Sequence, residues 1–409
     1  MMKTESEVKT CDGWKIEVAK SLEEIEDFRE IWERMQRNES IPALNANIDR
    51  YHSVMESLKE TVQPYIIVLY YYSDPKLLLV GRIETRQITC RVAYATIFKP
   101  SLRCLTVIYG GILGQASDRT SAKLLEELTN MLKHGDVDAV FFNQLQFDSP
   151  LYHLIRRKPN FLCRCYPPVV EPHWQTNLPD NTVAFYKDKS GSRKRYLRRY
   201  TRALEKASSG SVEMVCYRSE DKIDQVISIA SEISSKTYKH ALNVGFRDDY
   251  LTRSLLTKAA KQGKLRAYVL YAGGKPCAFE FGIEDGNVFF PEHIGYDPAL
   301  RSCSPGTVLF IKVMEDLIEN SNISVFDYGF GAAVYKERFG TKSWPEASVY
   351  IFAPRFYPIF INLLRSSIRC LNVGMLYVLK KVGSLEWIKR QWRGLLQGKN
   401  SDGKYEVGG

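Results

Sequence analysis

The sequence predicts a mixed α/β protein made of two similar lobes, each built on a central sheet, followed by a basic helical tail. The chain has 409 residues, which is enough for two domains that each bury a core. Apolar residues make up 44% and charged residues 25%, which excludes a collagen-like, a disordered or a disulfide-dense chain. One order of helices and strands also occurs in both halves, which favours a duplicated domain.

The first half is predicted to begin with helices and to continue with strands. Ser21 and Glu24 form a capping box, which predicts the start of the first helix. The remaining elements, read from hydrophobic periodicity and turn residues, are a helix at 51–58, strands at 65–72, 77–86, 91–98 and 104–110, a helix at 121–133 and a strand at 138–143.

The second half repeats this order after a basic helix at 186–206. Its predicted strands are 212–217, 265–271, 276–282, 287–296 and 325–329, and its predicted helices are 220–233, 248–261, 305–319 and 332–339. We therefore expect a tail at 1–12, an N-terminal lobe at 13–175, a C-terminal lobe at 176–354, amphipathic basic helices at 355–400 and a tail at 401–409.

Positive charge is concentrated in two segments. The net charge is +10, and residues 185–206 hold nine Lys or Arg and two acidic residues. Residues 355–399 hold nine Lys or Arg and a single acid, Glu386. The first segment predicts a solvated connecting helix or a clamp on an anionic ligand, and RNA is a further possible ligand of such a cationic helix. The second interleaves cations with Phe, Leu and Trp, which is typical of a helix at a membrane surface or of a helical hairpin that packs back on the C-terminal lobe.

The remaining composition predicts a cytoplasmic protein. The nine cysteines are scattered and lack CxxC pairs, so we expect reduced structural thiols. The polar N-terminus does not resemble a signal peptide, and no run of about 20 apolar residues predicts a spanning helix. We expect the chain in the cytoplasm, in contact with the inner face of the cell membrane through residues 355–400.

The segment 287–339 carries the strongest functional signal. Arg301, Ser304 and Gly306 give the pattern R-x-x-S-x-G at the start of the predicted helix. Ser304 is a favourable N-cap, Pro305 suits the first helical position, and Gly306 lets a ligand approach the backbone. A helix start of this kind offers N–H donors and a positive dipole end to a pyrophosphate.

In context these residues resemble the GNAT acetyltransferase superfamily, whose loop R/Q-x-x-G-x-G/A holds the coenzyme A pyrophosphate. The segment Tyr335–Gly340 (YKERFG) is similar to the family's Y-E-K-x-G-F segment. More narrowly, GYDP at 295–298, SPG at 304–306 and FDYG at 326–329 resemble the CelD/BcsL-type branch, linked to cellulose and exopolysaccharide biosynthesis. The chain is also similar to the FemABX transferases, which have tandem GNAT lobes and use aminoacyl-tRNA.

The resemblance implies tandem GNAT-like lobes with a catalytic C-terminal lobe and acetyl-CoA, or another acyl-CoA, as the donor. The pantetheine arm would enter between two strands that part, and residues 290–294 would supply its backbone partners. The implied cofactor-binding residues are Ile294, Arg301, Ser304, Gly306 and Thr307, and no metal is implied. Tyr335 would protonate the leaving thiolate; the alternative is a tyrosine that packs on the sheet.

Candidates for the base are Glu280, His293 and Asp327, besides Glu292. Glu280 lies in an apolar strand, where burial would raise its pKa. Glu292 and His293 should point to opposite faces of a strand, so only one of them would face the cleft. Asp327 would precede the Tyr335 helix and could orient a substrate.

Two features depart from the family pattern. Ser304 replaces the first glycine of the loop, and Pro305 removes an N–H, which leaves room for a FemABX-like donor. The N-terminal lobe has no such loop at Tyr109–Gly114 (YGGILG), whose glycines we expect to form a turn. We therefore expect that lobe to be structural or to bind the acceptor.

The sequence thus predicts an acyl-CoA-dependent N- or O-acyltransferase that acts on a cell-envelope or exopolysaccharide precursor. The expected acceptor is an anionic or saccharide small molecule, and DNA is not an expected partner. The alternatives are an aminoacyl-tRNA-dependent transferase and a catalytically silent scaffold of a polysaccharide synthase.

Overall fold

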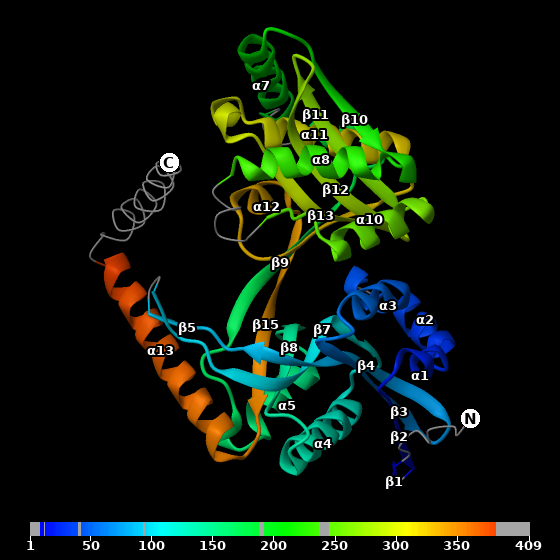
Figure 1. The fold of residues 1–409 in the computed structure, drawn as a ribbon, viewed down its shortest axis with the longest axis vertical. Coiled ribbons are helices and arrows are strands. Elements are labelled where there is room, and N and C mark those ends of the chain that lie inside the picture. Colours follow the sequence, from blue (N-terminus) through cyan, green and yellow to red (C-terminus); the bar gives the residue numbers. More distant parts are fainter. Residues whose placement is uncertain are drawn as a thin grey trace, which may run out of the picture. The chain divides into compact units, whose positions relative to one another are not determined.

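The computed structural model describes residues 9–11, 13–39, 42–92, 95–187, 192–237 and 245–381 (Figure 1). These residues form two compact units. Unit 1 comprises Met1–Ser21, Thr61–Val169 and Ala347–Gly409, and unit 2 comprises Leu22–Glu60 and Val170–Glu346. The segment Leu22–Glu60 thus groups with unit 2 and not with the residues that follow it.

Unit 1 is a mixed sheet with helices packed on it. Its strand order is β1 (Lys9–Cys11), β2 (Trp14–Ala19), β3 (Val62–Tyr71), β4 (Asp74–Gln87), β7 (Ser101–Gly114), β8 (Ala139–Gln146) and the end of β15 (Lys342–Phe352). A separate hairpin joins β5 (Cys90–Val92) to β6 (Ala95–Phe98). The helices are α4 (Asp118–His134), α5 (Pro150–Arg157), the 3-10 turn η2 (Phe161–Cys163) and α13 (Phe356–Lys381).

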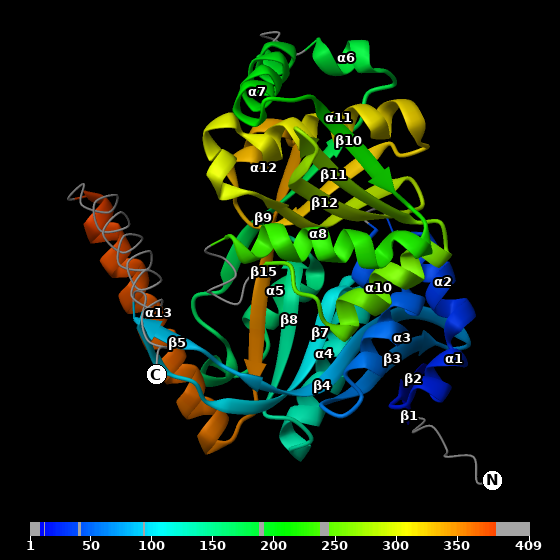
Figure 2. The same ribbon diagram turned by 45° about the horizontal axis from the view of Figure 1, so that its top comes forward.

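Unit 2 repeats this plan. Its strand order is β9 (Val169–Asn177), β14 (Val325–Phe330), β13 (Val288–Tyr296), β12 (Lys275–Asp285), β11 (Leu265–Ala272) and β10 (Val212–Tyr217). Its helices and 3-10 turns are α1 (Leu22–Glu26), α2 (Arg29–Arg37), η1 (Leu44–Ala46), α3 (Ile48–Ser57), α6 (Thr182–Tyr186), α7 (Ser192–Ser208), η3 (Glu220–Lys222), α8 (Ile223–Ser235), α10 (Tyr250–Lys261), η4 (Pro298–Cys303), α11 (Pro305–Asn320) and α12 (Val334–Phe339). Figure 2 shows helices on both sides of strands β10–β13.

The sheet of unit 2 separates two apolar cores because neighbouring side chains on a strand point to opposite faces. On one face, Tyr268 and Ala278 pack with α7 and α11. On the other face, Phe279 and Phe281 pack with α8 and α10. Every residue of β12 can therefore be assigned to the α11 face or to the α8 face.

The mixed α/β fold and most of its elements are as the sequence predicts. Outside the expected tails three strands were not predicted, β2, β9 and β15, and the expected strand at 91–98 is the β5–β6 hairpin. Three residues of the expected N-terminal tail form β1. The expected tail helices at 355–400 begin as α13, whereas 382–400 and the tail at 401–409 lie outside the described residues.

The glycines at 110 and 111 do not form the predicted turn. Tyr109–Gly114 lies inside β7, where the pairing with β4 shifts register between Leu79 and Gly81. A Cβ atom on Gly111 would lie 2.5 Å from the carbonyl oxygen of Val80, so only glycine fits this close approach. The segment therefore bends a strand and does not form a phosphate-binding loop.

A glycine-to-alanine pair tests the packing of β12 on β13. A Cβ atom on Gly295 would lie 2.4 Å from the ring of Phe279, so Gly295→Ala should lower the free energy of unfolding by about 1–3 kcal/mol. Gly374, in α13, has no atom within 4 Å of that position, and Gly374→Ala should raise stability by up to about 1 kcal/mol. Urea denaturation measures both; equal effects would contradict the close packing at Gly295.

Candidate active site

The central feature of unit 2 is the parting of two neighbouring parallel strands. β13 pairs with β14 at only two positions, Val288 with Val325 and Phe289 with Phe326. Beyond them β13 remains paired with β12, and β14 remains paired with β9 on its other side. The remainder of both strands thus presents backbone groups that do not bond across the opening, as the resemblance implies for a pantetheine site.

β13 carries a bulge at this opening. Phe281 pairs with His293 but Gly282 pairs with Pro291, so Glu292 is an extra residue without a partner on β12. The Glu292 carboxylate accepts two bonds from the Arg50 guanidinium of α3, at 3.1 and 2.5 Å. This bidentate pair holds the bulge in place. The bulge lies in the part of β13 beyond its pairing with β14.

The start of α11 lies next in the chain after β13. Ser304 takes the predicted N-cap position, but its backbone is left-handed (φ 50°) and its side chain does not cap the helix. Its carbonyl accepts bonds from the N–H groups of Thr307 and Val308, at 3.0 and 3.1 Å. Pro305 is the first helical residue, as predicted. A Cβ atom on Gly306 would meet the Tyr296 ring at 3.4 Å, so the helix start is closely approached by β13.

Helix α7 adds a tyrosine to this helix start. Burial raises the pKa of Tyr196, but hydrogen bonds with Ser304, Tyr200 and Thr307 outweigh it, and the net pKa is lowered. The guanidinium of Arg338, from α12, lies 4.5 Å from the centre of the Tyr196 ring. Hydroxyls from two helices and an exposed cation therefore gather where the resemblance expects a pyrophosphate. Arg301 is exposed on η4, and Ile294 is half exposed on β13.

Glu280 and Tyr335 both lie on the α11 face of the sheet, within electrostatic range of each other. Glu280 is opposite Tyr268 on β11 and Ile294 on β13, and its Oε1 is buried without a hydrogen-bond partner among the described residues. Burial raises the pKa of Glu280 to about 8. Burial also raises the pKa of Tyr335 to about 12, with a further contribution from the charge of Glu280. Near neutral pH both groups therefore hold a proton.

Helix α12, which carries Tyr335, is anchored to the end of β14. The Lys336 ammonium donates to the carbonyl oxygens of Gly329 and Phe330, at 3.3 and 2.7 Å. The Tyr335 ring lies 6.3 Å from the centre of the Phe310 ring in α11. These contacts hold Tyr335, the second residue of α12, against α11.

Asp327 lies apart from this pair, in a buried network with His173. The Asp327 carboxylate accepts from His173 Nε2 at 2.8 Å, from Gln175 Nε2 at 2.8 Å and from the Gly329 N–H at 2.7 Å. His173 Nδ1 lies 3.3 Å from Glu346 Oε2, and its ring stacks on Trp344. Because these bonds use both oxygens of Asp327, it orients the strands and is not a free base.

His173 is held in its charged form by this network. Burial would lower the pKa of His173, but the hydrogen bonds and charges of Asp327 and Glu346 raise it to about 9. The imidazolium therefore lies between two carboxylates with all three side chains at most 3% exposed. This charge bridges β9, β14 and the first residues of β15.

His293 lies on the opposite face of the sheet from Glu280. It is paired with Phe281, and its ring meets the edge of Phe246 at 5.2 Å. Burial lowers the pKa of His293, with opposing effects from the charges of Glu292 and Arg50. Glu292, the adjacent residue in the bulge, acts through its charge against this lowering.

The predicted catalytic residues are therefore distributed over three environments. Glu280 and Tyr335 lie together, His293 is on the other face, and Asp327 is in the His173 network. Four residues of the site were not predicted from the sequence: His173, Glu346, Tyr196 and Arg50. His173 lies on the unpredicted strand β9, and only the buried Asp327 on β14 signalled that a partner was needed.

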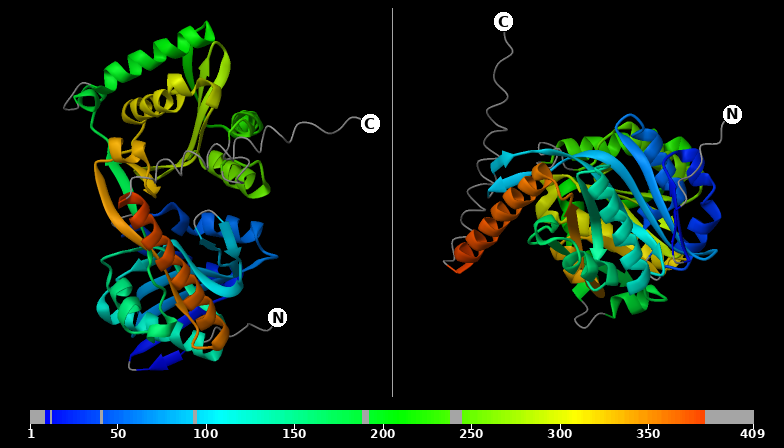
Figure 3. Two further views of the ribbon diagram at one scale, coloured as in Figure 1. Left: turned by 90° about the vertical axis from the view of Figure 1, so that its left-hand side faces the viewer. Right: turned by 90° about the horizontal axis from the view of Figure 1, so that it is seen from below.

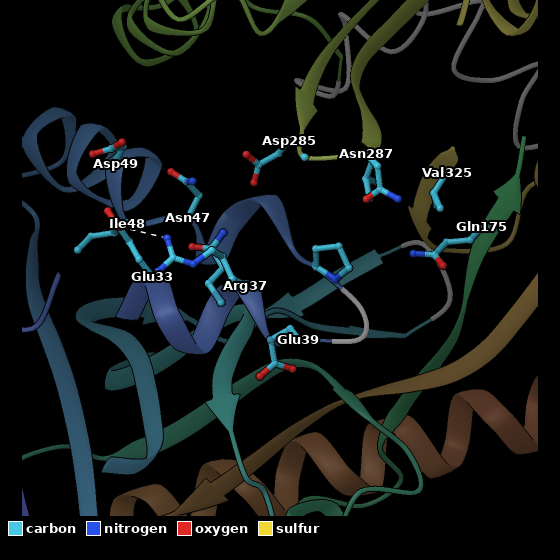
Figure 4. A pocket seen from close by; sticks show the side chains of 14 residues that line it. Glu33, Arg37, Glu39, Asn47, Ile48, Asp49, Gln175, Asp285, Asn287 and Val325 are labelled. Atoms are coloured by element: carbon cyan, nitrogen blue, oxygen red, sulfur yellow. Dashed lines mark ion pairs between the residues drawn. The ribbon is translucent and has the colours of Figure 1, made fainter. Parts of the chain in front are cut away.

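A cavity of about 500 Å³ opens at the other end of these strands (Figure 4). Its lining includes Val288 and Val325, where β13 and β14 are still paired, and Gln175, which holds Asp327. Four carboxylates (Glu33, Glu39, Asp49 and Asp285), one guanidinium (Arg37) and several amides complete a polar wall. In the described part of the chain no group of His, Cys, Asp and Glu could hold a metal ion.

Comparisons with known proteins agree with this architecture. Residues 191–337 match the acetyltransferase (GNAT) domain family. The crystal structure of FemX superposes with a TM-score of 0.53 and 7% identity, covering 82% of this chain and 98% of that one. No curated protein matches the sequence.

Two further solved structures are more distant. A tandem GNAT protein from the clavulanic acid biosynthesis pathway has a TM-score of 0.48, 10% identity and coverage of 83% and 99% of the two chains. The C-terminal domain of a putative lysylphosphatidylglycerol synthetase from Agrobacterium fabrum has a TM-score of 0.48, 11% identity and coverage of 84% and 96%. The match to the GNAT domain and the superposition on FemX confirm the mixed α/β, GNAT-type fold, and the narrower CelD/BcsL assignment stays a prediction.

The charged His173 should make stability depend on pH. Its folded pKa, about 9, exceeds the usual value near 6.5, so the stabilisation is fully present below about pH 6.5 and is lost as the pH rises through 9. At pH 6, His173→Asn should cost about 3–5 kcal/mol, because it leaves two buried carboxylates without their cation. The difference from wild type should shrink above pH 9.

Chemical denaturation at pH 6, 8 and 10 measures this effect. His153→Asn is the matched control, because His153 is exposed on α5 and its loss should change stability by less than about 0.5 kcal/mol. A penalty for His173→Asn that does not change with pH would show that its charge is not what stabilises the strands.

Proposed function

We propose that the chain is an acyl-CoA-dependent N- or O-acyltransferase that acts on a cell-envelope or exopolysaccharide precursor. The observation that carries this proposal is the opening of β13 from β14 beside the start of α11. A thioester needs a slot for its arm, donors for its phosphates and a proton donor for its sulfur. The match of residues 191–337 to the acetyltransferase (GNAT) domain supports the same reaction class.

The residues around α11 suit a pyrophosphate. The hydroxyls of Ser304, Thr307 and Tyr196 can donate to phosphate oxygens, and Arg338 supplies a positive charge on the same side. Helix α7 adds exposed cations, among them Lys194, Arg198 and Arg202. The fit requires Tyr196 to release Ser304 and Thr307 or to share them with the ligand.

Groups on the two faces of the opening would carry out different proton transfers, one to the leaving thiolate and one from the attacking acceptor. On the α11 face, Tyr335 holds a proton on its Oη for the thiolate that leaves, and neutral Glu280 can restore that proton. On the α8 face, His293 remains a neutral imidazole because burial lowers its pKa, so it can accept the proton of the attacking amine or hydroxyl. The bound thioester supplies the acyl group.

The cavity at the start of β13 and β14 is our candidate for the acceptor. Its carboxylates and amides can bond to hydroxyl or amino groups, and its excess of acids disfavours an anion. Of the two expected acceptor classes, it therefore favours a saccharide over an anionic molecule.

An aminoacyl-tRNA donor is the second candidate. The exposed face of α7 carries Lys194, Arg195, Arg198, Arg199, Arg202 and Lys206, and a cationic helix of this kind can follow a phosphate backbone. The likeness to FemX shows a shared fold and leaves the choice of donor open.

Calorimetry with acetyl-CoA tests the donor. We expect saturable binding, weakened about tenfold by Arg338→Gln through the loss of one charge-assisted contact. Arg34→Gln, which removes an exposed cation of α2, should bind as wild type does. Absence of binding up to millimolar acetyl-CoA, with binding of alanyl-tRNA, would replace this proposal by the second; binding of neither would favour a silent scaffold.

Substitutions of Tyr335 and Glu280 test the proton steps, with thiol release from acetyl-CoA as the measurement. Tyr335→Phe should lower kcat by about 10²–10⁴-fold with little change in acetyl-CoA affinity. Because neutral Glu280 is needed, the rate should fall as the pH rises through about 8, and Glu280→Gln should remove this fall. Tyr250→Phe, at an exposed position, is the control. A rate that rises through pH 8 would instead make Glu280 a base.

A further inference from the structure

Helix α13 exposes an apolar stripe on unit 1. Phe356, Phe360, Leu363 and Leu371 follow one another at helical spacing, and their exposed fractions are 87, 48, 46 and 58%. The residues between them on the same side, Ser367 and Cys370, are exposed and uncharged. The stripe runs over about 15 residues, or roughly 22 Å of helix. Figure 3 shows α13 (orange) along the outside of unit 1.

The two cations of α13 whose side chains are described, Arg365 and Arg369, lie on the side that faces the unit. Ile361 is fully buried, and the Asn362 amide donates to the carbonyl oxygens of Leu162 and Arg164, at 2.9 and 2.7 Å. The Arg365 guanidinium lies 4.8 Å from the centre of the Tyr350 ring and is 8% exposed. In its described part the helix therefore buries a cation beside apolar and amide side chains on its inner side, and it exposes apolar side chains on its outer side.

The segments in contact with α13 add further exposed apolar side chains and further cations. Asn362 links the helix to η2, which exposes Phe161 and Leu162, and Asn372 links it to β5 through the carbonyl oxygen of Arg91. Residues 90–99, 156–166 and 355–381 contain two, four and five Lys or Arg respectively, and no Asp or Glu. Arg91, Lys99, Arg157 and Lys158 are exposed. The surroundings of the stripe are thus cationic.

These features suit the interface of a bilayer. Among the described residues, no helix has the length and hydropathy to span a membrane. An interfacial helix needs an exposed apolar side for the acyl region and nearby cations for anionic headgroups. Contact with water alone does not explain the stripe, because a continuous row of exposed apolar side chains has an unfavourable free energy of hydration unless another surface covers it.

We propose that unit 1 docks on the surface of an anionic lipid bilayer through the apolar stripe of α13. The occupant is lipid because the cations around the stripe have no acidic counterpart in these segments, which complements an anionic surface. Residues 382–409 or a second copy of the chain would need to supply acidic groups to match that charge, and residues 382–409 contain only Glu386, Asp402 and Glu406. The proposal is independent of the transferase reaction.

Co-sedimentation of the full chain with vesicles tests the docking. We expect binding to vesicles of phosphatidylcholine with 30% phosphatidylglycerol, weak binding to pure phosphatidylcholine, and release at high salt. The double variant Phe360→Ser/Leu363→Ser should bind at least about tenfold more weakly. The matched control, Val183→Ser/Tyr250→Ser, removes two exposed apolar side chains from unit 2 and should bind as wild type does.

A probe in the stripe distinguishes the possible occupants. Cys370 is exposed, so an environment-sensitive fluorophore on it should shift to the blue when anionic vesicles are added. Unchanged fluorescence, or equal vesicle binding by the stripe variant, would overturn the proposal. So would self-association of the wild type that the stripe variant loses, which would identify a second copy, or protection of Cys370 from alkylation without lipid, which would identify residues 382–409.

The stripe variant should retain its affinity for acetyl-CoA, because α13 belongs to unit 1. Loss of lipid binding and loss of acetyl-CoA binding can therefore be read separately.

Discussion

The buried charge of His173 is the interaction on which the candidate site depends. Its imidazolium joins Asp327 on β14 to Glu346 on β15, and β9 carries it between them. The network holds β14 to β9, while β13 stays paired with β12 on the side away from β14. The opening between β13 and β14 is the geometric result, since two strands that are each held by an outer neighbour can part without breaking either ladder.

The opening also divides the chemistry between the faces of the sheet. Because β12 and β13 alternate their side chains, Glu280 and Tyr335 lie with α11 on one face, and His293 lies with Phe246 on the other. A thioester that enters from the α11 face would meet its proton donor there. The bulge at Glu292, which Arg50 holds, lies on β13 next to His293.

Local signals made the loop and α11 predictable, because Pro305 and the residues before it define a helix start within a few positions. The sequence of β12 was equally informative, because a carboxylate among apolar strand residues, Glu280, predicted that this side chain is buried. The buried network of Asp327 could not be predicted, because its partner His173 lies on a strand that follows two prolines and whose periodicity is therefore hidden. The orientation of α13 was also beyond the sequence, since interleaved Phe and Arg residues fit either face until the contacts of Arg365 with Tyr350 are known.

Amide hydrogen exchange of the full chain, with and without acetyl-CoA, tests the central claim most directly. Ligand between the parted strands should slow exchange in residues 290–296 and 304–308, on β13 and at the start of α11, and leave the glycine-containing segment 109–114 of β7 unchanged. Protection confined to residues 109–114, or binding without protection of β13 and α11, would contradict the assignment of this opening as the donor site.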